Sequence, residues 1–285
     1  MDLRQLRYFL TVAEELHFVR AAERLGIAQP PLTLTIQKLE RELDCTLFIR
    51  GRQTQLTEAG MKLAEEARLV LDQAEHAFEA TRRIARGEAG ELRVGVPPSV
   101  MLTRLPDAIR RYRRRYPQVA FTLREMGTAA IERALLDRTI DLGFLRESKG
   151  PPSLYAGLFL TEPLVAVLPA THPLAKQKNL RLQALRKEPF VFFPRRIGPA
   201  FHDVLLAECG DAGFVPNIVQ EATQWQTVIT LVEAGMGVTI APACVEKFAF
   251  AGVVYRKLPG HGTRIYACRL PEAPSTVGNF LNAAS

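Results

Sequence analysis

Three polar side chains with the chemistry to bind an anion follow three successive predicted strands in the later part of the chain. Ser99 and Thr128 each come just after a strand, where a helix starts, and Arg146 stands at the end of the third strand. A hydroxyl and the free N–H groups of a helix start hold a carboxylate, and a guanidinium group pairs with an anion. Pro199 and Phe201 follow a Phe-rich strand, where they would form a wall. These five residues predict a binding site for a small carboxylate.

Each of these polar residues also has an ordinary structural role as an alternative. Ser99 and Thr128 would cap the helices that they precede, and Arg146 would form an ion pair at the surface. Trp225 lies on a predicted helix just past a strand, and we expect it in the core rather than at a hinge.

A regular alternation of strands and helices begins at residue 91 and must position these side chains. The order strand, helix, strand, helix, strand predicts a parallel sheet, and ligands bind at the carboxyl ends of such strands. A second unit of the same kind follows. The predicted strands are 92–96, 119–123, 140–145, 164–168, 190–193, 217–221 and 237–241, and the helices are 102–116, 129–136, 200–208 and 224–234.

The first 90 residues instead predict helices with one short pair of strands. Apolar residues recur at helical spacing over 3–13 and 18–25, and a third helix begins at Gln29 after the turn 26–28. Two short helices joined in this way form a helix-turn-helix, whose second helix enters the DNA major groove. An ordinary helical hairpin is the alternative. Two short strands with a polar tip are expected between residues 47 and 57.

A long helical stretch that opens at Thr57 carries an apolar stripe at spacings of three and four residues. A lone helix of this length would leave its stripe in water, so we expect a partner in the same chain or in a second copy. The stripe consists of Leu63, Ala67, Val70, Leu71, Ala74, Phe78 and Ile84. Residues 86–90, which follow it, have the composition of a hinge.

A series of motifs in one order covers residues 1–60. The series is Leu6-x-x-Phe9-x-x-Val12-Ala13, Phe18-x-x-Ala21-Ala22-x-x-Leu25, Gln29-Pro30, Leu39-Glu40-x-x-Leu43, Leu47-Phe48-x-Arg50 and Leu56-Thr57-x-Ala59-Gly60. With these motifs the segment resembles the winged helix-turn-helix of the LysR-type transcriptional regulators. The long helix and the α/β part also fit that family, so the resemblance covers nearly the whole chain.

The resemblance implies which residues lie at the DNA. Gln29 suits a bidentate contact to adenine, and Thr33 would reach a base or a phosphate. Arg50 and Arg52, at the wing, would neutralise phosphates, with solvated surface arginine as the alternative. The full set of DNA-binding candidates is Gln29, Pro30, Pro31, Thr33, Leu34, Arg50 and Arg52.

Three departures from the family pattern bear on DNA binding. Ala28 stands where the family commonly has Ser, which removes a capping hydroxyl. Leu34 stands where the family commonly has Arg, and it would either contact a thymine methyl or remove a phosphate contact. The stretch between Arg50 and Leu56 is one residue short. A family member that has lost DNA binding is therefore an alternative.

Four further motifs carry a likeness to the family's effector domain, which has the periplasmic-binding-protein fold. They are Met126-Gly127-Thr128, Ile140-Asp141-x-Gly143-Phe144-x-Arg146, Pro199-x-Phe201 and Thr239-Ile240-Ala241-Pro242-Ala243. They resemble most closely the muconate- and benzoate-responsive regulators of aromatic degradation. The resemblance implies a DNA-binding domain at 1–60, a linker and dimerisation helix at 61–90, and an effector-binding domain at 91–285, with subdomain I at 91–162 and 266–285 and subdomain II at 163–265.

The charge is distributed unevenly along the 285 residues. The formal net charge of +7 suggests a nucleic-acid partner, yet residues 1–90 carry 13 Lys and Arg against 14 Asp and Glu. DNA affinity must therefore come from a few placed residues, helix ends and dimer symmetry. The surplus of +8 in the later part fits an anionic ligand or subunit contacts. The arginine-rich run 110–115 would be surface charge or an ion-pair face between subunits.

Catalytic and metal-binding patterns are absent from the sequence. The GxSxG, HExxH, P-loop and GxGxxG motifs do not occur, and the five histidines and four cysteines are scattered without metal-ligand spacing. No apolar run is long enough for a membrane span, and the N-terminal residues form no signal core. We therefore predict no enzyme, no cofactor and no metal, and inert cysteines in a reduced cytoplasm.

These observations together predict a cytoplasmic DNA-binding transcriptional regulator that senses a small carboxylate. An intermediate of aromatic catabolism is one candidate for this carboxylate. The expected partners are double-stranded promoter DNA, a small anionic effector, further copies of the chain in a dimer of dimers, and RNA polymerase, with no membrane. Two alternatives stay open. One is a soluble solute-binding sensor with impaired or lost DNA binding, and the other is a small-molecule enzyme of the α/β class.

Overall fold

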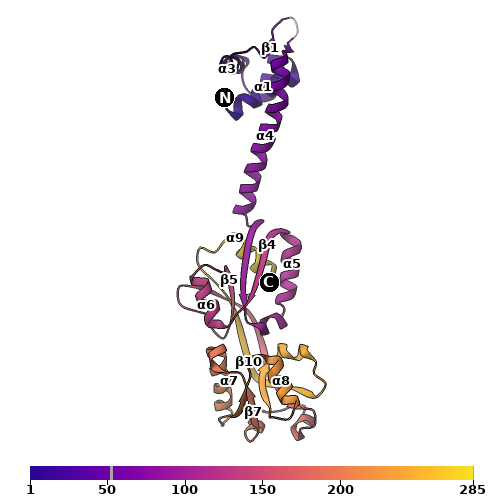
Figure 1. Cartoon of the computed structure of the whole chain (residues 1–285), viewed down its shortest axis with the longest axis vertical. Coiled ribbons are helices and arrows are strands. Elements are labelled where there is room, and N and C mark those ends of the chain that lie inside the picture. The colour runs from indigo at the N-terminus through magenta and orange to yellow at the C-terminus, as the bar shows by residue number, and fades with distance from the viewer. Residues whose placement is uncertain (52–53, 285) are drawn as a thin grey trace. The chain divides into compact units, whose positions relative to one another are not determined.

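The computed structural model describes residues 1–51 and 54–284 and contains two compact units (Figure 1). The first unit is Met1–Arg83, and the second begins at Ile84. Each unit has its own hydrophobic core. Within the described ranges no helix combines the length and the apolar character needed to cross a membrane.

The first unit consists of three short helices, a pair of two-residue strands and a long helix. Asp2 and Gln5 form a capping box that starts the first helix, and Gly26, at a φ of 68°, ends the second. The strand pair confirms the predicted wing strands. The elements are α1 (Leu3–Glu15), α2 (Phe18–Leu25), α3 (Gln29–Glu42), β1 (Phe48–Ile49), β2 (Gln55–Leu56) and α4 (Glu58–Ala85).

The core of the first unit fixes α3 against the other helices. Phe9 of α1 and Leu32 and Ile36 of α3 are completely buried, as expected from the helical spacing of the apolar residues. Gly60 lets α4 begin directly against the wing, because a Cβ at this position would lie 2.2 Å from the Leu47 carbonyl oxygen. The glycine of the Ala59-Gly60 motif is therefore a packing requirement.

The second unit is built on a mixed sheet of six strands in the order β4-β3-β5-β10-β6-β9. The strands β3, β4 and β5 are parallel, as predicted, and β10 runs antiparallel to both β5 and β6. The strands are β3 (Ala89–Val96), β4 (Gln118–Glu125), β5 (Leu142–Arg146), β6 (Tyr155–Pro169), β9 (Thr239–Pro242) and β10 (Val253–Arg269), and β7 (Pro189–Phe192) and β8 (Asn217–Glu221) form a separate parallel pair.

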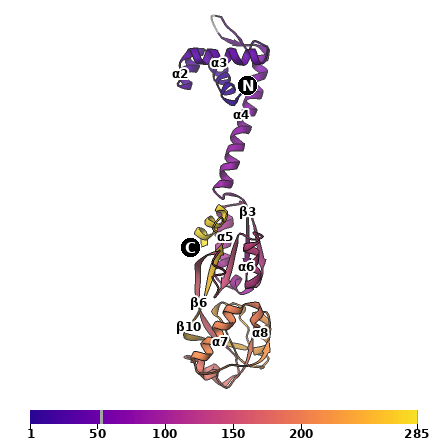
Figure 2. The same cartoon turned by 90° about the vertical axis from the view of Figure 1, so that its left-hand side faces the viewer.

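Two long strands, β6 and β10, connect two lobes of this unit. At one end β10 pairs with β5, and at the other end β6 pairs with β9. Figure 2 shows both strands passing from the first lobe, which contains α5 and α6, to the second lobe, which contains α7 and α8. The helices and short 3-10 turns are η1 (Pro98–Leu102), α5 (Leu105–Arg115), α6 (Thr128–Leu136), η2 (Pro173–Lys176), η3 (Leu182–Leu185), η4 (Arg195–Ile197), α7 (Pro199–Asp211), α8 (Trp225–Glu233), η5 (Ala243–Phe248) and α9 (Ser275–Ala284).

The structure corrects the predicted elements in several places. The predicted second unit does not form one parallel sheet, because β6 runs antiparallel to β9 and β7 pairs with β8 in a separate sheet. The expected helix 102–116 is shorter than predicted. The 3-10 turn η1 ends at Leu102 and α5 begins at Leu105, with Pro106 in its first turn, where a missing N–H is tolerated. Ser99 therefore lies in a 3-10 turn and not at the start of an α-helix. The sequence also gave no sign of β10, because residues 259–262 contain Pro and two Gly and resemble a turn. The structure accommodates them as an irregularity between Lys257 and Gly262.

Candidate functional site

The first turn of α3 is exposed and lacks a side-chain cap. Ala28 is its N-cap residue and makes no side-chain hydrogen bond, as its type implies. Gln29, Pro30 and Pro31, which follow, are exposed. Because the helix end carries the positive pole of the dipole and no carboxylate caps it, this turn suits an approach by a phosphate or a base edge.

Thr33 and Leu34, further along α3, differ in their exposure to solvent. The side chain of Leu34 is 62% exposed. The Thr33 hydroxyl is instead covered by the protein and has no hydrogen-bond partner among the described residues. A rotation about χ1 would be needed to bring that hydroxyl to the surface.

The wing arginine Arg50 already has an acidic partner within the protein. Its Nη2 donates to Oε2 of Glu40 at 3.0 Å, and its guanidinium group lies 5.6 Å from the ring centroid of Phe18. Oε1 of Glu40 accepts the N–H of Leu47 at 2.9 Å. Glu40 therefore connects α3 to the wing, and Arg50 has partners within the protein and is not a purely solvated arginine. Arg52 lies outside the described residues.

In the second unit, the first turns of α6 and α7 come close to each other from the two lobes. Their N-cap residues are Gly127 and Gly198, neither of which supplies a capping side chain. A Cβ on Gly127 would lie 3.1 Å from the Ile197 carbonyl oxygen, and one on Gly198 would lie 4.0 Å from Oγ1 of Thr128. Two positive helix poles and the Thr128 hydroxyl therefore converge, with Pro199 as the first residue of α7.

Ser99 contacts the second lobe through Cys244. Burial raises the pKa of the Cys244 thiol to about 12, so the sulfur carries its proton at neutral pH. The thiol donates to the Ser99 carbonyl oxygen, with 3.4 Å between Sγ and the oxygen. A second link between these segments comes from Lys247, whose Nζ donates to the Thr103 carbonyl oxygen at 3.1 Å. The turn that carries Ser99 is therefore attached to η5.

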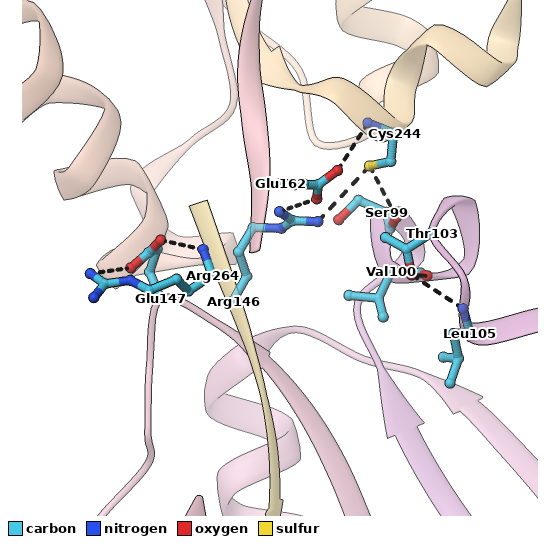
Figure 3. Close-up of polar contacts among 9 residues, drawn as sticks. All are labelled: Ser99, Val100, Thr103, Leu105, Arg146, Glu147, Glu162, Cys244 and Arg264. Carbon is cyan, nitrogen blue, oxygen red and sulfur yellow. Dashed lines mark hydrogen bonds and ion pairs between the residues drawn. The ribbon is translucent and has the colours of Figure 1, made fainter. Parts of the chain in front are cut away.

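Arg146 is buried in an ion pair with Glu162, as Figure 3 shows. Its Nη1 donates to Oε1 of Glu162 at 2.5 Å, and the other carboxylate oxygen accepts the N–H of Cys244 at 3.0 Å. Only 4% of the Arg146 side chain and 8% of the Glu162 side chain are exposed. The alternative of a surface ion pair is therefore wrong about the location, because the pair lies in the interior. Nε of Arg146 is covered and has no partner among the described residues.

Aromatic rings pack around this ion pair from the second lobe. The Arg146 guanidinium lies 5.2 Å from the ring centroid of Phe201, which stacks on Phe193 at 5.4 Å. Trp225 lies 5.5 Å from Phe193 and packs against the core of the second lobe, as expected. The structure therefore brings Ser99, Arg146 and Phe201 together through Cys244 and Glu162, and it brings Thr128 to the first turn of α7.

Two central residues of this cluster were not predicted from the sequence. Glu162 is the single charged residue of β6 and stands between Thr161 and Pro163 in a largely apolar strand, and this pattern is a signal for a buried carboxylate. Cys244 had no such signal, because a buried cysteine is ordinary. Over residues 1–51 and 54–284, no group of three or more His, Cys, Asp or Glu side chains is arranged to hold a metal ion.

Comparisons with known proteins agree with this architecture. Residues 3–61 match the model of the bacterial regulatory helix-turn-helix protein, lysR family, and residues 85–284 match that of the LysR substrate binding domain. The chain belongs to the LysR family. It is therefore a DNA-binding transcriptional regulator with an effector-binding domain, and not an enzyme.

Individual relatives extend over nearly the whole chain. YnfL of Escherichia coli K12, an uncharacterized HTH-type transcriptional regulator, is 42% identical over 249 residues, which are 87% of this chain and 84% of that protein. The crystal structure of the LysR family regulator CbnR has a TM-score of 0.84 at 28% identity and full coverage of both chains. CbnR in complex with its target DNA has a TM-score of 0.79 at 28% identity, with 100% of this chain and 98% of that chain covered. The alternative of a solute-binding sensor without DNA binding gains no support from these relatives.

Breaking the buried ion pair between Arg146 and Glu162 should destabilise the second unit. The variant Glu162→Gln leaves Arg146 charged and without a carboxylate, and breaking a buried pair costs about 3–5 kcal/mol. We expect the free energy of unfolding of the second unit to fall by this amount in urea. Trp225, the single tryptophan of the chain, reports on this unit by its fluorescence.

The matched control is Asp203→Asn, which removes an exposed ion pair with Arg195. We expect this variant to unfold close to the wild-type urea midpoint, because solvent screens exposed pairs. Equal midpoints for the two variants would contradict the structural role of Glu162.

Proposed function

We propose that this regulator reads promoter DNA with the first turn of α3. The observation that supports the proposal is the exposure of Gln29, Pro30 and Pro31 beside an uncapped helix start. An exposed glutamine amide suits the N6 and N7 atoms of adenine. Leu34, at 62% exposure, suits a thymine methyl and gives up the charge of the arginine common in the family. Thr33 would contact a base or a phosphate after its hydroxyl rotates outward. Arg50 and Arg52 would bind phosphates of the DNA backbone.

The variant Gln29→Ala tests this assignment. We expect promoter affinity to fall by about 1–3 kcal/mol, which is the discrimination of one good bidentate base contact. Fluorescence anisotropy with a labelled promoter fragment measures the change. Gln73→Ala, at an exposed position of α4, is the control and should bind like the wild type. Unchanged affinity and unchanged sequence preference in Gln29→Ala would exclude this contact.

We further propose that a small carboxylate effector binds between the two lobes. The observation that carries this proposal is the convergence of the first turns of α6 and α7. Free N–H groups at two helix starts and the hydroxyls of Thr128 and Ser99 provide donors for a carboxylate. Pro199 and Phe201 would line the wall beside the body of the effector.

Arg146 has a supporting role in this proposal. Glu162 offsets its charge within 2.5 Å, so the attraction for an anion at Arg146 is weaker than for an unpaired guanidinium. Its Nε has no partner among the described residues but is covered, so it would donate to an effector only after a rearrangement. The helix starts therefore supply most of the anion binding, and the Arg146–Glu162 pair fixes the wall against which the effector lies.

Effector binding would act on the DNA through the assembly of several copies. The α4 residues Leu69 and Phe78 are 64% and 56% exposed, which supports pairing of this helix with a second copy. In this proposal, residues 61–90 join the DNA-binding domains of two copies. The effector lies between one lobe, formed by 91–162 and 266–285, and the other lobe, formed by 163–265. The effector would shift the population of arrangements in a dimer of dimers. Promoter DNA as the target supports a cytoplasmic location, with RNA polymerase as an expected partner.

The variant Thr128→Val tests the effector site. It keeps the shape of the side chain and removes the hydroxyl, and a hydrogen bond to a charged group contributes about 1.5–3 kcal/mol. Calorimetric titration with a carboxylate effector should show weaker binding by this amount and unchanged promoter affinity. Thr139→Val, an exposed position past the other end of α6, is the control. Equal effector affinity in Thr128→Val and wild type would rule out this contact.

A further inference from the structure

A basic segment of the second lobe, residues 172–188, contains a surface hollow. The hollow has a volume of about 580 Å³, and all of its lining residues lie between Leu174 and Glu188. This volume is within the range of small-molecule sites. None of the residues proposed to bind the effector belongs to the lining. The hollow is therefore separate from the proposed site between the lobes.

Buried leucines and short turns hold the backbone of this segment in place. The side chains of Leu180, Leu182 and Leu185 are buried in the core of the second lobe. Backbone hydrogen bonds close the turns η2 and η3, and one of them runs from the N–H of Ala184 to the Arg181 carbonyl oxygen at 2.9 Å. The polar side chains between the leucines are exposed. The hollow is therefore a feature of an anchored loop.

The single carboxylate of the segment closes this loop. Glu188 is the only Asp or Glu between residues 172 and 188. Nδ1 of His172 accepts the N–H of Leu174 at 3.2 Å, so the neutral ring carries its proton on Nε2. Nε2 lies 3.2 Å from Oε2 of Glu188 and donates to it. This bond joins the two ends of the segment and directs the carboxylate to the histidine and not to the neighbouring cations.

Five basic side chains of the segment are exposed, and none of them forms an ion pair among the residues that the structure describes. They are Lys176, Lys178, Arg181, Arg186 and Lys187. Five cations and one carboxylate give the segment a net charge of +4, which is half of the surplus of +8 in residues 91–285. The positive charge of the later part of the chain is therefore concentrated here.

The lining of the hollow combines three of these cations with side-chain amides. Arg181, Arg186 and Lys187 supply the charge, and the amides belong to Gln177, Asn179 and Gln183. Guanidinium, ammonium and amide groups all carry N–H donors. The hollow therefore presents many donors and an excess of positive charge, which is the chemistry that binds phosphate groups.

A second and more apolar hollow adjoins the first. It has a volume of about 420 Å³, and Asn179, Arg181 and Gln183 line both hollows. Its apolar lining comes from Leu180, Leu182, Ala212 and Pro259. Asp211 also lines it and forms no ion pair among the described residues, so its carboxylate is available to a hydroxyl or amino group. A ligand that spans both hollows would meet cations at one end and apolar surface at the other.

We propose that this segment binds a small ligand that carries two or more linked phosphate groups on an organic body. The phosphates lie in the basic hollow against Arg181, Arg186 and Lys187, and the organic body lies in the adjoining hollow. A planar guanidinium group forms two parallel hydrogen bonds with a phosphate, and a lysine adds a point charge. A nucleoside triphosphate has this combination of charge and body.

The charge and the shape of the site both favour this class of ligand. A ligand with a single carboxylate would leave two of the three lining cations unpaired, whereas linked phosphates pair with all of them. A DNA duplex would contact only the cations at the rim and would leave both hollows empty. The two adjoining hollows therefore favour a small phosphorylated ligand over the DNA backbone.

The triple variant Arg181→Gln/Arg186→Gln/Lys187→Gln tests the proposal. The measurement is calorimetric titration of the full chain with inorganic triphosphate and with ATP. We expect both to bind the wild type, ATP more tightly. We expect the variant to bind each at least about tenfold more weakly, the factor for losing one hydrogen bond to a charge.

The matched control is Arg113→Gln/Arg114→Gln/Arg115→Gln, which removes the same charge from exposed positions of α5 in the first lobe. We expect it to titrate like the wild type. Circular dichroism confirms that each variant is folded before it is titrated.

Four results would overturn this site. The first is that neither probe binds the wild type, and the second is equal weakening in both triple variants, because binding would then depend on net charge alone. The third is equal affinity for ATP and triphosphate, which would exclude the adjoining hollow. The fourth is unchanged triphosphate binding in the Arg181 triple variant with weaker binding of random-sequence DNA, because the segment would then be a surface for the DNA backbone.

Discussion

Glu162 accepts hydrogen bonds from groups that belong to different parts of the second unit. Arg146 donates to it from the end of β5, and the backbone of Cys244 donates to it from η5. The carboxylate itself stands on β6, one of the two strands that run through both lobes. Taking these charges out of water is unfavourable, so the pair persists only because its geometry and its additional hydrogen bonds offset that cost. The position of the two lobes next to Arg146 therefore depends on this one carboxylate.

In the proposed effector site, the same ion pair would decide which groups bind the anion. An arginine whose charge is offset inside the protein attracts a ligand less than a free one, and the remaining attraction must come from elsewhere. Helix dipoles and backbone N–H groups are suited to this task, because they carry no net charge and need no counterion in the empty site. The DNA-binding unit likewise does not depend on a large net charge. Residues 1–90 have nearly balanced charge, and the exposed start of α3 offers oriented groups in place of bulk charge.

Sequence reasoning predicted most elements of the fold and the residue types of the site, but not its internal pairing. Periodicity was sufficient for α1, α2 and α3, because their apolar residues point to one core. It failed for β10, whose irregular middle holds Pro259 and Gly260 and contradicts any local strand pattern. Arg146 was predicted at a strand end, yet its partner is 16 residues away on a strand of which only the later half was predicted. Such a pairing is a property of the sheet order, which no local pattern contains.

In the proposed effector site, two converging helix starts hold a carboxylate between the lobes. The most direct measurement is thermal unfolding of the full chain, followed by Trp225 fluorescence, with matched pairs of small carboxylic acids and their primary amides. We expect that at least one acid raises the unfolding temperature of the second unit in a concentration-dependent manner, and that its amide does not. Stabilisation by an amide equal to that by its acid would contradict the claim, because the site would then recognise the body of the ligand and not its charge.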